Sequence, residues 1–124
     1  MSRIYISGRM TGLPDLNRHA FDAAEMRLIA QGHFVINPHR ISELFGTAKE
    51  LAKSFVALYG ETPFGGSGYS PRLAHAVMDA DLAAVRSCDA IYLLRGWESS
   101  RGAKKELAEA LAHGLTVMQE GGEE

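Results

Sequence analysis

The sequence predicts an α/β protein: a three-layer sandwich in which helices cover both faces of a short, mostly parallel sheet of about four strands. Short and almost continuously apolar segments alternate with longer segments whose apolar residues recur at helical spacing. Strands without a polar face are typical of a sheet that is covered on both sides. The predicted order is strand, helix, strand, helix, helix, strand, helix, strand, which is a Rossmann-like or flavodoxin-like arrangement.

Residues 3–7 predict the first strand, because they are β-branched and aromatic and are followed by Gly8. A helix is predicted over 18–31, with Asn17 placed to cap it, and a second strand over 33–36. Such a strand–helix–strand unit is right-handed, and its ligand end lies at the carboxyl ends of the strands. The glycine-containing loop after the first strand is therefore predicted to lie at the functional edge of the sheet.

The middle of the chain predicts two helices separated by an irregular segment. Residues 40–59 are helical in period, and a further helix is predicted over 71–87, opened by proline. Between them, residues 60–71 contain four glycines and two prolines, which exclude regular structure. We interpret this segment as a flexible loop that acts as a lid or as a dimer element.

The carboxyl-terminal part predicts a strand over 90–94, a helix over 100–113 with a C-cap at Gly114, and a last strand over 115–118. Residues 119–124 form an acidic, glycine-containing tail that we expect to be frayed. The whole chain is predicted to form one domain, which its 124 residues suit.

Composition narrows the classes of function. The formal net charge is −2, which gives no electrostatic case for binding a nucleic-acid polymer. The only cysteine, Cys88, excludes an intramolecular disulfide. No signal-peptide layout and no apolar run of ~20 residues is present, so we expect a cytoplasmic protein that does not cross a membrane.

Two carboxylates lie on predicted apolar helix faces. Asp81 lies four residues after Val77 and four before Val85, so it points with them toward the core. Glu106 borders the apolar stripe formed by Ala103, Leu107, Ala110 and Leu111. A carboxylate in such a place must find partners or change its pKa, and either outcome is typical of an active site. The alternative is a solvated helix edge, or an acid that caps a neighbouring turn.

The loop over 96–102 has the composition of an anion site. It combines glycines, hydroxyls and a guanidinium at a predicted helix N-terminus, where backbone N–H groups bind anions. Ser100, Arg101 and the backbone of Gly102 are the candidate ligands. Alternatively, Ser100 is only an N-cap and Arg101 only a surface charge. Trp97 is interpreted either as a stacking platform for a base or as a cover for the core.

Other kinds of site are not indicated. None of the five histidines has a metal-ligand spacing with a cysteine or an acid beside it, so neither a metal site nor a cofactor is predicted. The Walker-type phosphate loop, the dinucleotide-binding glycine pattern and the nucleophile elbow are absent. The carboxylates and the loop before Glu106 remain as the candidate site.

The sequence closely resembles the DUF4406 family of phage and bacterial proteins, whose function is unknown. The resemblance covers nearly the whole chain, and its matching segments are 4–8, 10–12, 37–38, 88–94 and 96–103, together with Glu106. The segment Gly-Trp-Glu-x-Ser-Arg-Gly-Ala is specific. Arg9 stands where the family usually has proline, which changes the first loop and adds an anion contact.

More distantly, the chain is similar to the nucleoside 2-deoxyribosyltransferase superfamily and its nucleoside monophosphate N-glycosidase branch. The transferases carry an Asp-x-Gly-x-x-x-Glu motif with a glutamate nucleophile, and here the aligned segment is 100–106. The resemblance implies that Glu106 is the nucleophile. Serine replaces the aspartate at position 100, as in the branch that hydrolyses monophosphates, which implies that Ser100 binds phosphate.

The same resemblance implies the roles of other residues. The upstream aspartate of the superfamily falls on Asp81, and the tyrosine and glycine of its first strand fall on Tyr5 and Gly8, near the sugar and the base. The candidate catalytic residues are therefore Glu106 and Asp81. The candidate ligand-binding residues are Tyr5, Gly8, Arg9, Met10, Trp97, Ser100, Arg101 and Gly102.

The expected function is a nucleotide-binding protein that hydrolyses or transfers the N-glycosidic bond of a (deoxy)nucleoside or its 5′-monophosphate. The alternatives are a non-catalytic nucleotide sensor or phage accessory protein with the same cavity, and a purely structural module. The expected partner is a small-molecule nucleoside or nucleotide. The superfamily resemblance also implies a homodimer or a higher homo-oligomer.

Overall fold

The sheet has four strands, and every pairing in it is parallel. The computed structural model describes residues 2–10, 12–41, 43 and 71–121. The strands are β1 (Arg3–Ser7), β2 (Phe34–Ile36), β3 (Ala90–Leu93) and β4 (Thr116–Gln119), in the order β2-β1-β3-β4. The register places Tyr5 beside Ile36 on one side and beside Ile91 on the other. The predicted short parallel sheet of four strands is confirmed.

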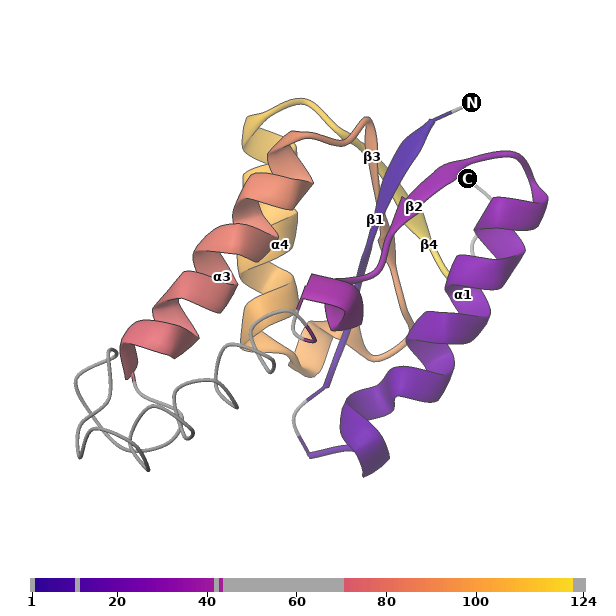
Figure 1. The fold of residues 1–124 in the computed structure, drawn as a ribbon. Coiled ribbons are helices and arrows are strands. Elements are labelled where there is room, and N and C mark those ends of the chain that lie inside the picture. Colours follow the sequence, from indigo (N-terminus) through magenta and orange to yellow (C-terminus); the bar gives the residue numbers. More distant parts are fainter. Residues whose placement is uncertain (1, 11, 42, 44–70, 122–124) are drawn as a thin grey trace, which may run out of the picture.

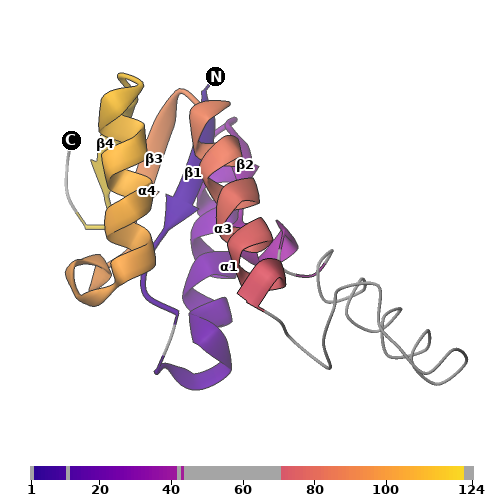
Figure 2. The ribbon, with the colours of Figure 1, turned by 90° about the vertical axis from the view of Figure 1, so that its left-hand side faces the viewer.

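Helices cover both faces of this sheet (Figures 1 and 2). Helix α1 (Arg18–Ala30) covers one face, and α3 (Pro71–Arg86) and α4 (Arg101–Ala112) lie side by side on the other. Two short 3-10 helices, η1 (Pro14–Asn17) and η2 (Trp97–Ser99), precede α1 and α4. The three-layer α/β architecture follows the prediction. None of the helices in the described ranges is long and apolar enough to span a membrane.

The core divides into two parts because successive side chains of a strand point to opposite faces. Ile4 and Ile6 of β1 face α1, whereas Tyr5 faces α4. The cluster under α1 consists of Ile4, Ile6, Phe21, Ala24, Leu28, Ala90 and Leu94. The cluster under α3 and α4 consists of Tyr5, Val85, Cys88, Ile91, Leu93, Ala110 and Leu115. The alternation of β1 thus decides which of its side chains face α4.

Two expectations about the ends of elements are corrected. Asn17 occupies the N-cap position of α1, but its backbone is left-handed (φ 62°) and its side chain donates to the carbonyl of Arg9 (3.0 Å) instead of capping. The predicted frayed tail does not include residues 119 and 120. Gln119 belongs to β4, and Glu120 accepts from the N–H of Arg95 (3.0 Å) and pairs with Arg27 (3.3 Å).

Part of the predicted middle region lies outside the described residues. Residues 38–41 and 43 are helical, so this helix already includes Pro38, two residues before the predicted start at 40. Residues 42 and 44–59 of the predicted helix lie outside the described residues, and so does the predicted loop over 60–70.

The strand order creates a topological switch between β1 and β3. From β1 the chain crosses to β2 on one side, whereas β3 continues to β4 on the other side. The loops that leave the carboxyl ends of β1 and β3 therefore diverge, and ligands of open α/β sheets bind in the crevice between such loops. The candidate residues after β1 and after β3 are brought together at this crevice.

Gly8 is required by the close approach of β1 to the end of β3. A Cβ atom at this position would lie 2.8 Å from Cβ of Leu94 and 3.0 Å from its Cδ1. Because Cβ is fixed to the backbone, a side chain at Gly8 would push the two segments apart.

Gly8→Ala is therefore expected to lower the free energy of unfolding by about 1–3 kcal/mol, the usual cost of overpacking. Gly102→Ala is the matched control, because a Cβ there meets only Met78 Cε at 3.7 Å and Ser100 Oγ at 3.9 Å. Urea unfolding of both variants measures the difference. Equal stability of Gly8→Ala and the wild type would contradict the close approach.

Candidate functional site

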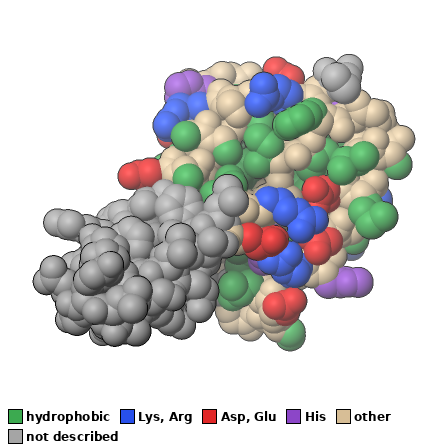
Figure 3. Space-filling model, viewed as in Figure 1, with side chains coloured by type: hydrophobic (Ala, Val, Ile, Leu, Met, Phe, Trp, Pro, Cys, Tyr) green, Lys and Arg blue, Asp and Glu red, His purple; other side chains and the backbone are tan. Residues whose placement is uncertain are grey.

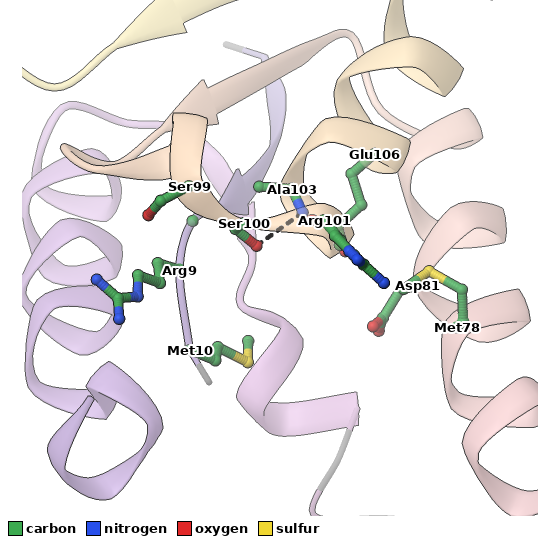
Figure 4. A pocket seen from close by; sticks show the side chains of 11 residues that line it. Arg9, Met10, Met78, Asp81, Ser99, Ser100, Arg101, Ala103 and Glu106 are labelled. Atoms are coloured by element: carbon green, nitrogen blue, oxygen red, sulfur yellow. Dashed lines mark hydrogen bonds between the residues drawn. The ribbon is translucent and has the colours of Figure 1, made fainter. Parts of the chain in front are cut away.

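A cavity of about 480 Å³ lies at the carboxyl ends of β1 and β3 (Figure 4). It is lined by the first loop, by α3, and by the turn that leads into α4. The described lining residues are Gly8, Arg9, Met10, Met78, Asp81, Ser99, Ser100, Arg101, Gly102, Ala103 and Glu106. Most of the residues that the sequence marked as candidates thus share one cavity, although they come from three separate segments.

Glu106 lies on the face of α4 that packs over β1, and its side chain is 6% exposed. The hydroxyl of Tyr5 donates to Oε2 at 2.7 Å, and the hydroxyl of Ser7 donates to Oε1 at 2.6 Å. Tyr5 and Ser7 are two residues apart in a strand, so both point to the face that α4 covers. Each carboxylate oxygen of Glu106 therefore has its own donor.

Burial and hydrogen bonding act on Glu106 in opposite directions. Burial raises the pKa of its carboxyl group, and the hydrogen bonds from Ser7 and Tyr5 lower that pKa; burial is the larger effect. The pKa of Tyr5 is raised, first by burial and then by the charge of Glu106. The phenol therefore stays protonated and serves as a donor to the carboxylate.

Asp81 enters the cavity from α3, whereas Glu106 comes from α4 (Figure 4). Its side chain is 7% exposed, which confirms the core-facing position predicted from helical spacing. Burial first, and then the charge of Glu106, raises its pKa to about 7. Its buried Oδ1 atom has no hydrogen-bond partner within the described part of the chain.

The turn between β3 and α4 presents polar groups to the other side of the cavity. Gly96 adopts a left-handed conformation (φ 87°) and starts η2, where Ser99 Oγ donates to the carbonyl of Gly96 at 2.9 Å. Ser100 caps α4 and accepts from the N–H of Ala103 at 3.1 Å, so its predicted role as an N-cap is confirmed. The Ser100 hydroxyl hydrogen has no acceptor among the described residues and is free to bind a ligand.

Two arginines line the cavity from different loops. Arg101 is the first residue of α4 and is exposed, with no ion pair to any residue that the structure describes. Arg9 follows β1 and bends back over its own loop. Its Nη2 atom would lie 3.0 Å from a Cβ atom at Gly12. Figure 4 shows the two side chains on opposite sides of Ser100.

Two predicted ligand-binding residues do not line the cavity. Tyr5 has no exposed surface and reaches the cavity only through Glu106. Trp97 packs against the core cluster under α3 and α4, which favours the second of its two interpretations. Within the described part of the chain its buried Nε1 has no partner.

Sequence reasoning missed four residues of the site. Ser7 contacts Glu106 directly, and its signal was a polar residue at the carboxyl end of an otherwise apolar strand. Met78 lies three residues before Asp81, which places it on the same helix face. Ser99 and Ala103 flank the turn and the start of α4. The positions of these residues in their strand or helix could be predicted from the sequence. Which of them face the cavity could not.

The surface in Figure 3 carries acidic and basic side chains intermixed, without a continuous basic surface. Five charged residues form a network of ion pairs, namely Arg18, Asp22, Glu25, Arg40 and Glu43. The described residues contain no cluster of three or more His, Cys, Asp or Glu side chains that could bind a metal ion.

Comparison with known proteins gives a family and a fold. The sequence matches the model of a family described as a domain of unknown function (DUF4406), over residues 2–58 and 68–119. No curated protein matches. A solved structure of a 2-deoxyribosyltransferase from the psychrotolerant bacterium Bacillus psychrosaccharolyticus is similar, with a TM-score of 0.60 and 22% sequence identity. The match covers 94% of this chain and 70% of that chain, and it shows that the two share a fold.

Proposed function

This chain belongs to the DUF4406 family, and for it we propose the hydrolysis or transfer of the N-glycosidic bond of a (deoxy)nucleoside or its 5′-monophosphate. The observation that carries the proposal is the environment of Glu106, a buried carboxylate at a cavity with one hydroxyl donor on each oxygen. The fold that the chain shares with a 2-deoxyribosyltransferase supports the same chemistry.

In the proposed reaction, a carboxylate oxygen of Glu106 attacks the anomeric carbon of the sugar. The bond from that carbon to the base nitrogen breaks, and its electron pair leaves with the base. Asp81, whose pKa is raised to about 7, is partly protonated near neutral pH and supplies the proton that the leaving base takes up. The product of this step is a glycosyl ester of Glu106 and a free base.

The second step releases the enzyme. A water molecule attacks the anomeric carbon in hydrolysis, or the nitrogen of a second base attacks it in transfer, and the carboxylate of Glu106 leaves. Deprotonated Asp81 accepts the proton that the attacking water or base loses, which restores the starting state.

The other side of the cavity suits the 5′-phosphate. We assign the phosphate to the free hydroxyl of Ser100, the guanidinium of Arg101 and the backbone N–H of Gly102 at the start of α4. Arg9 would contact the anion from the opposite loop. Met10 and Met78 supply apolar surface for the base or the sugar. In this assignment Tyr5 supports Glu106, Gly8 permits close approach of the backbone, and Trp97 supports the turn.

The direct test is to incubate the protein with ribo- and deoxyribonucleosides and their 5′-monophosphates, and to measure free base by chromatography. Release of base from at least one compound supports the proposal. Binding measured by calorimetry without release of base would identify the protein as a nucleotide sensor with the same cavity and not as an enzyme. If neither binding nor release is observed, the protein is a structural module.

Arg101→Ala is expected to weaken the binding of a nucleoside monophosphate by about tenfold to a hundredfold, because a charge-assisted hydrogen bond contributes about 1.5–3 kcal/mol. Binding of the matching nucleoside, which lacks phosphate, should be nearly unchanged. Isothermal titration with both ligands measures the ratio. Lys104→Ala is the control, since Lys104 is exposed on the same helix and lies outside the described cavity lining. Equal losses for the two ligands would show that Arg101 does not contact phosphate.

A further inference from the structure

We propose that Ser7 is a positioning residue: its hydroxyl, bound to Oε1, fixes the orientation in which Glu106 faces the cavity. The inference rests on the proposed function for its catalytic consequence, but its structural content stands on Ser7 and Glu106 alone. No motif in the sequence marked Ser7, which is the last residue of β1.

Two hydrogen bonds limit the freedom of the Glu106 side chain. The last torsion of a glutamate side chain is broad, so one hydrogen bond leaves the carboxylate group free to rotate. Tyr5 alone would hold Oε2 at 2.7 Å and leave Oε1 to turn. The second donor, Ser7 at 2.6 Å on Oε1, fixes the plane of the group. A nucleophile gains most from such fixed orientation, since small displacements from the reactive geometry are costly.

Ser7 is itself held in the sheet. Ser7 has no exposed surface. It is paired with Leu93 in the ladder between β1 and β3, and its carbonyl accepts from the N–H of Leu94 at 2.8 Å. The following residue, Gly8, is held close to Leu94. The hydroxyl of Ser7 is therefore presented from a fixed strand end and not from a mobile loop.

Ser7 has no direct role toward the ligand. Ser7 does not belong to the described cavity lining, and its side-chain hydrogen bond goes to Glu106. It acts on the ligand only through that carboxylate, which makes it a positioning residue. Its effect is also electrostatic, because a hydrogen bond donated to a carboxylate favours the charged form. The bond thus opposes the burial that raises the pKa of Glu106.

Several titratable or charged groups lie around Glu106, and the test must keep them constant. Tyr5 faces it from β1, and Asp81 faces it from α3. Arg9 and Arg101 line the same cavity, from the loop after β1 and from the start of α4. Ser7→Ala changes none of these groups and removes only the donor to Oε1.

The first measurement is the titration of Glu106 by NMR in protein with ¹³C-labelled glutamate carboxyl groups, with the signal assigned by its absence in Glu106→Gln. In Ser7→Ala we expect Glu106 to titrate at higher pH than in the wild type. Ser7→Thr keeps the hydroxyl and should titrate close to the wild type. Ser87→Ala, which removes an exposed serine hydroxyl bound to the carbonyl of Ala84 at 2.7 Å, is the control and should leave Glu106 unchanged.

The second measurement is kinetic. In Ser7→Ala, kcat for base release should fall by about tenfold to a hundredfold with little change in KM, and the acid limb of kcat/KM should move to higher pH. An unchanged Glu106 titration in Ser7→Ala would overturn the inference. A shifted titration in a protein whose wild type releases no base would support the role of Ser7 and reject the proposed function, so the two failures are distinguishable.

Discussion

Glu106→Gln is expected to abolish the release of free base, with a loss of at least about a thousandfold in kcat, because an amide cannot form the glycosyl ester. The variant should still fold. Glutamine has nearly the same shape as glutamate, and the hydroxyls of Tyr5 and Ser7, which now donate to the carboxylate, are also able to accept from an amide N–H. Binding of the nucleotide should therefore persist while turnover disappears.

The measurement is chromatographic detection of base at enzyme concentrations that give a clear signal for the wild type. Glu98→Gln is the matched control, since it makes the same chemical change at an exposed residue of η2 outside the described cavity lining. Full activity in Glu106→Gln would assign the chemistry to another group. A glycosyl adduct on Glu106, trapped with a slow substrate and located by peptide mass spectrometry, would identify the atom that is modified.

Asp81→Asn is expected to change both stability and rate, in opposite directions. Because burial and the charge of Glu106 raise the pKa of Asp81 to about 7, the folded protein keeps a proton that the unfolded chain has lost above about pH 4. The contribution of Asp81 to stability is therefore full at low pH and is lost as the pH rises toward 7. Asparagine does not ionise, so the variant should be more stable than the wild type at pH 8.

The expected gain at pH 8 is about 1–3 kcal/mol in the free energy of unfolding, and it should vanish near pH 4. Denaturant unfolding at several pH values measures it, with Asp79→Asn on the exposed side of the same helix as the control. Base release by Asp81→Asn should fall by about a hundredfold or more, since the leaving base then lacks its proton donor. A constant stability difference across the pH range would contradict the raised pKa of Asp81.

Sequence pattern predicted the fold because the information it needs is local. The strand β1 and the helices α3 and α4 were predicted within one residue at each end, since strand and helix periods are properties of the nearby chain. The end of β4 was less predictable. Polar residues at 119 and 120 resemble a free tail, but Glu120 is held by Arg95 and Arg27, which come from distant parts of the chain.

The chemistry of the candidate site could be predicted from the sequence, but the set of residues that form it was less predictable. Helical spacing placed Asp81 on an inward face and Glu106 at the border of an apolar stripe, and both residues are buried. The composition of the turn before α4 marked Ser100 and Arg101, which line the cavity. The stacking role of Trp97 could not be judged from composition, because the loop conformation decides whether an indole faces a ligand or the core.

The amino-acid sequence by itself determined the order of elements, their apolar faces and the carboxylates that those faces must accommodate. Only the tertiary structure decided which groups meet. Ser7 and Glu106 are 99 positions apart, and their 2.6 Å hydrogen bond exists because β1 pairs with β3 and α4 crosses over β1. The raised pKa of Asp81 has the same origin, since burial and a second carboxylate come from packing. Periodicity fixes the direction of a side chain relative to its own element, whereas docking of the elements fixes its neighbours.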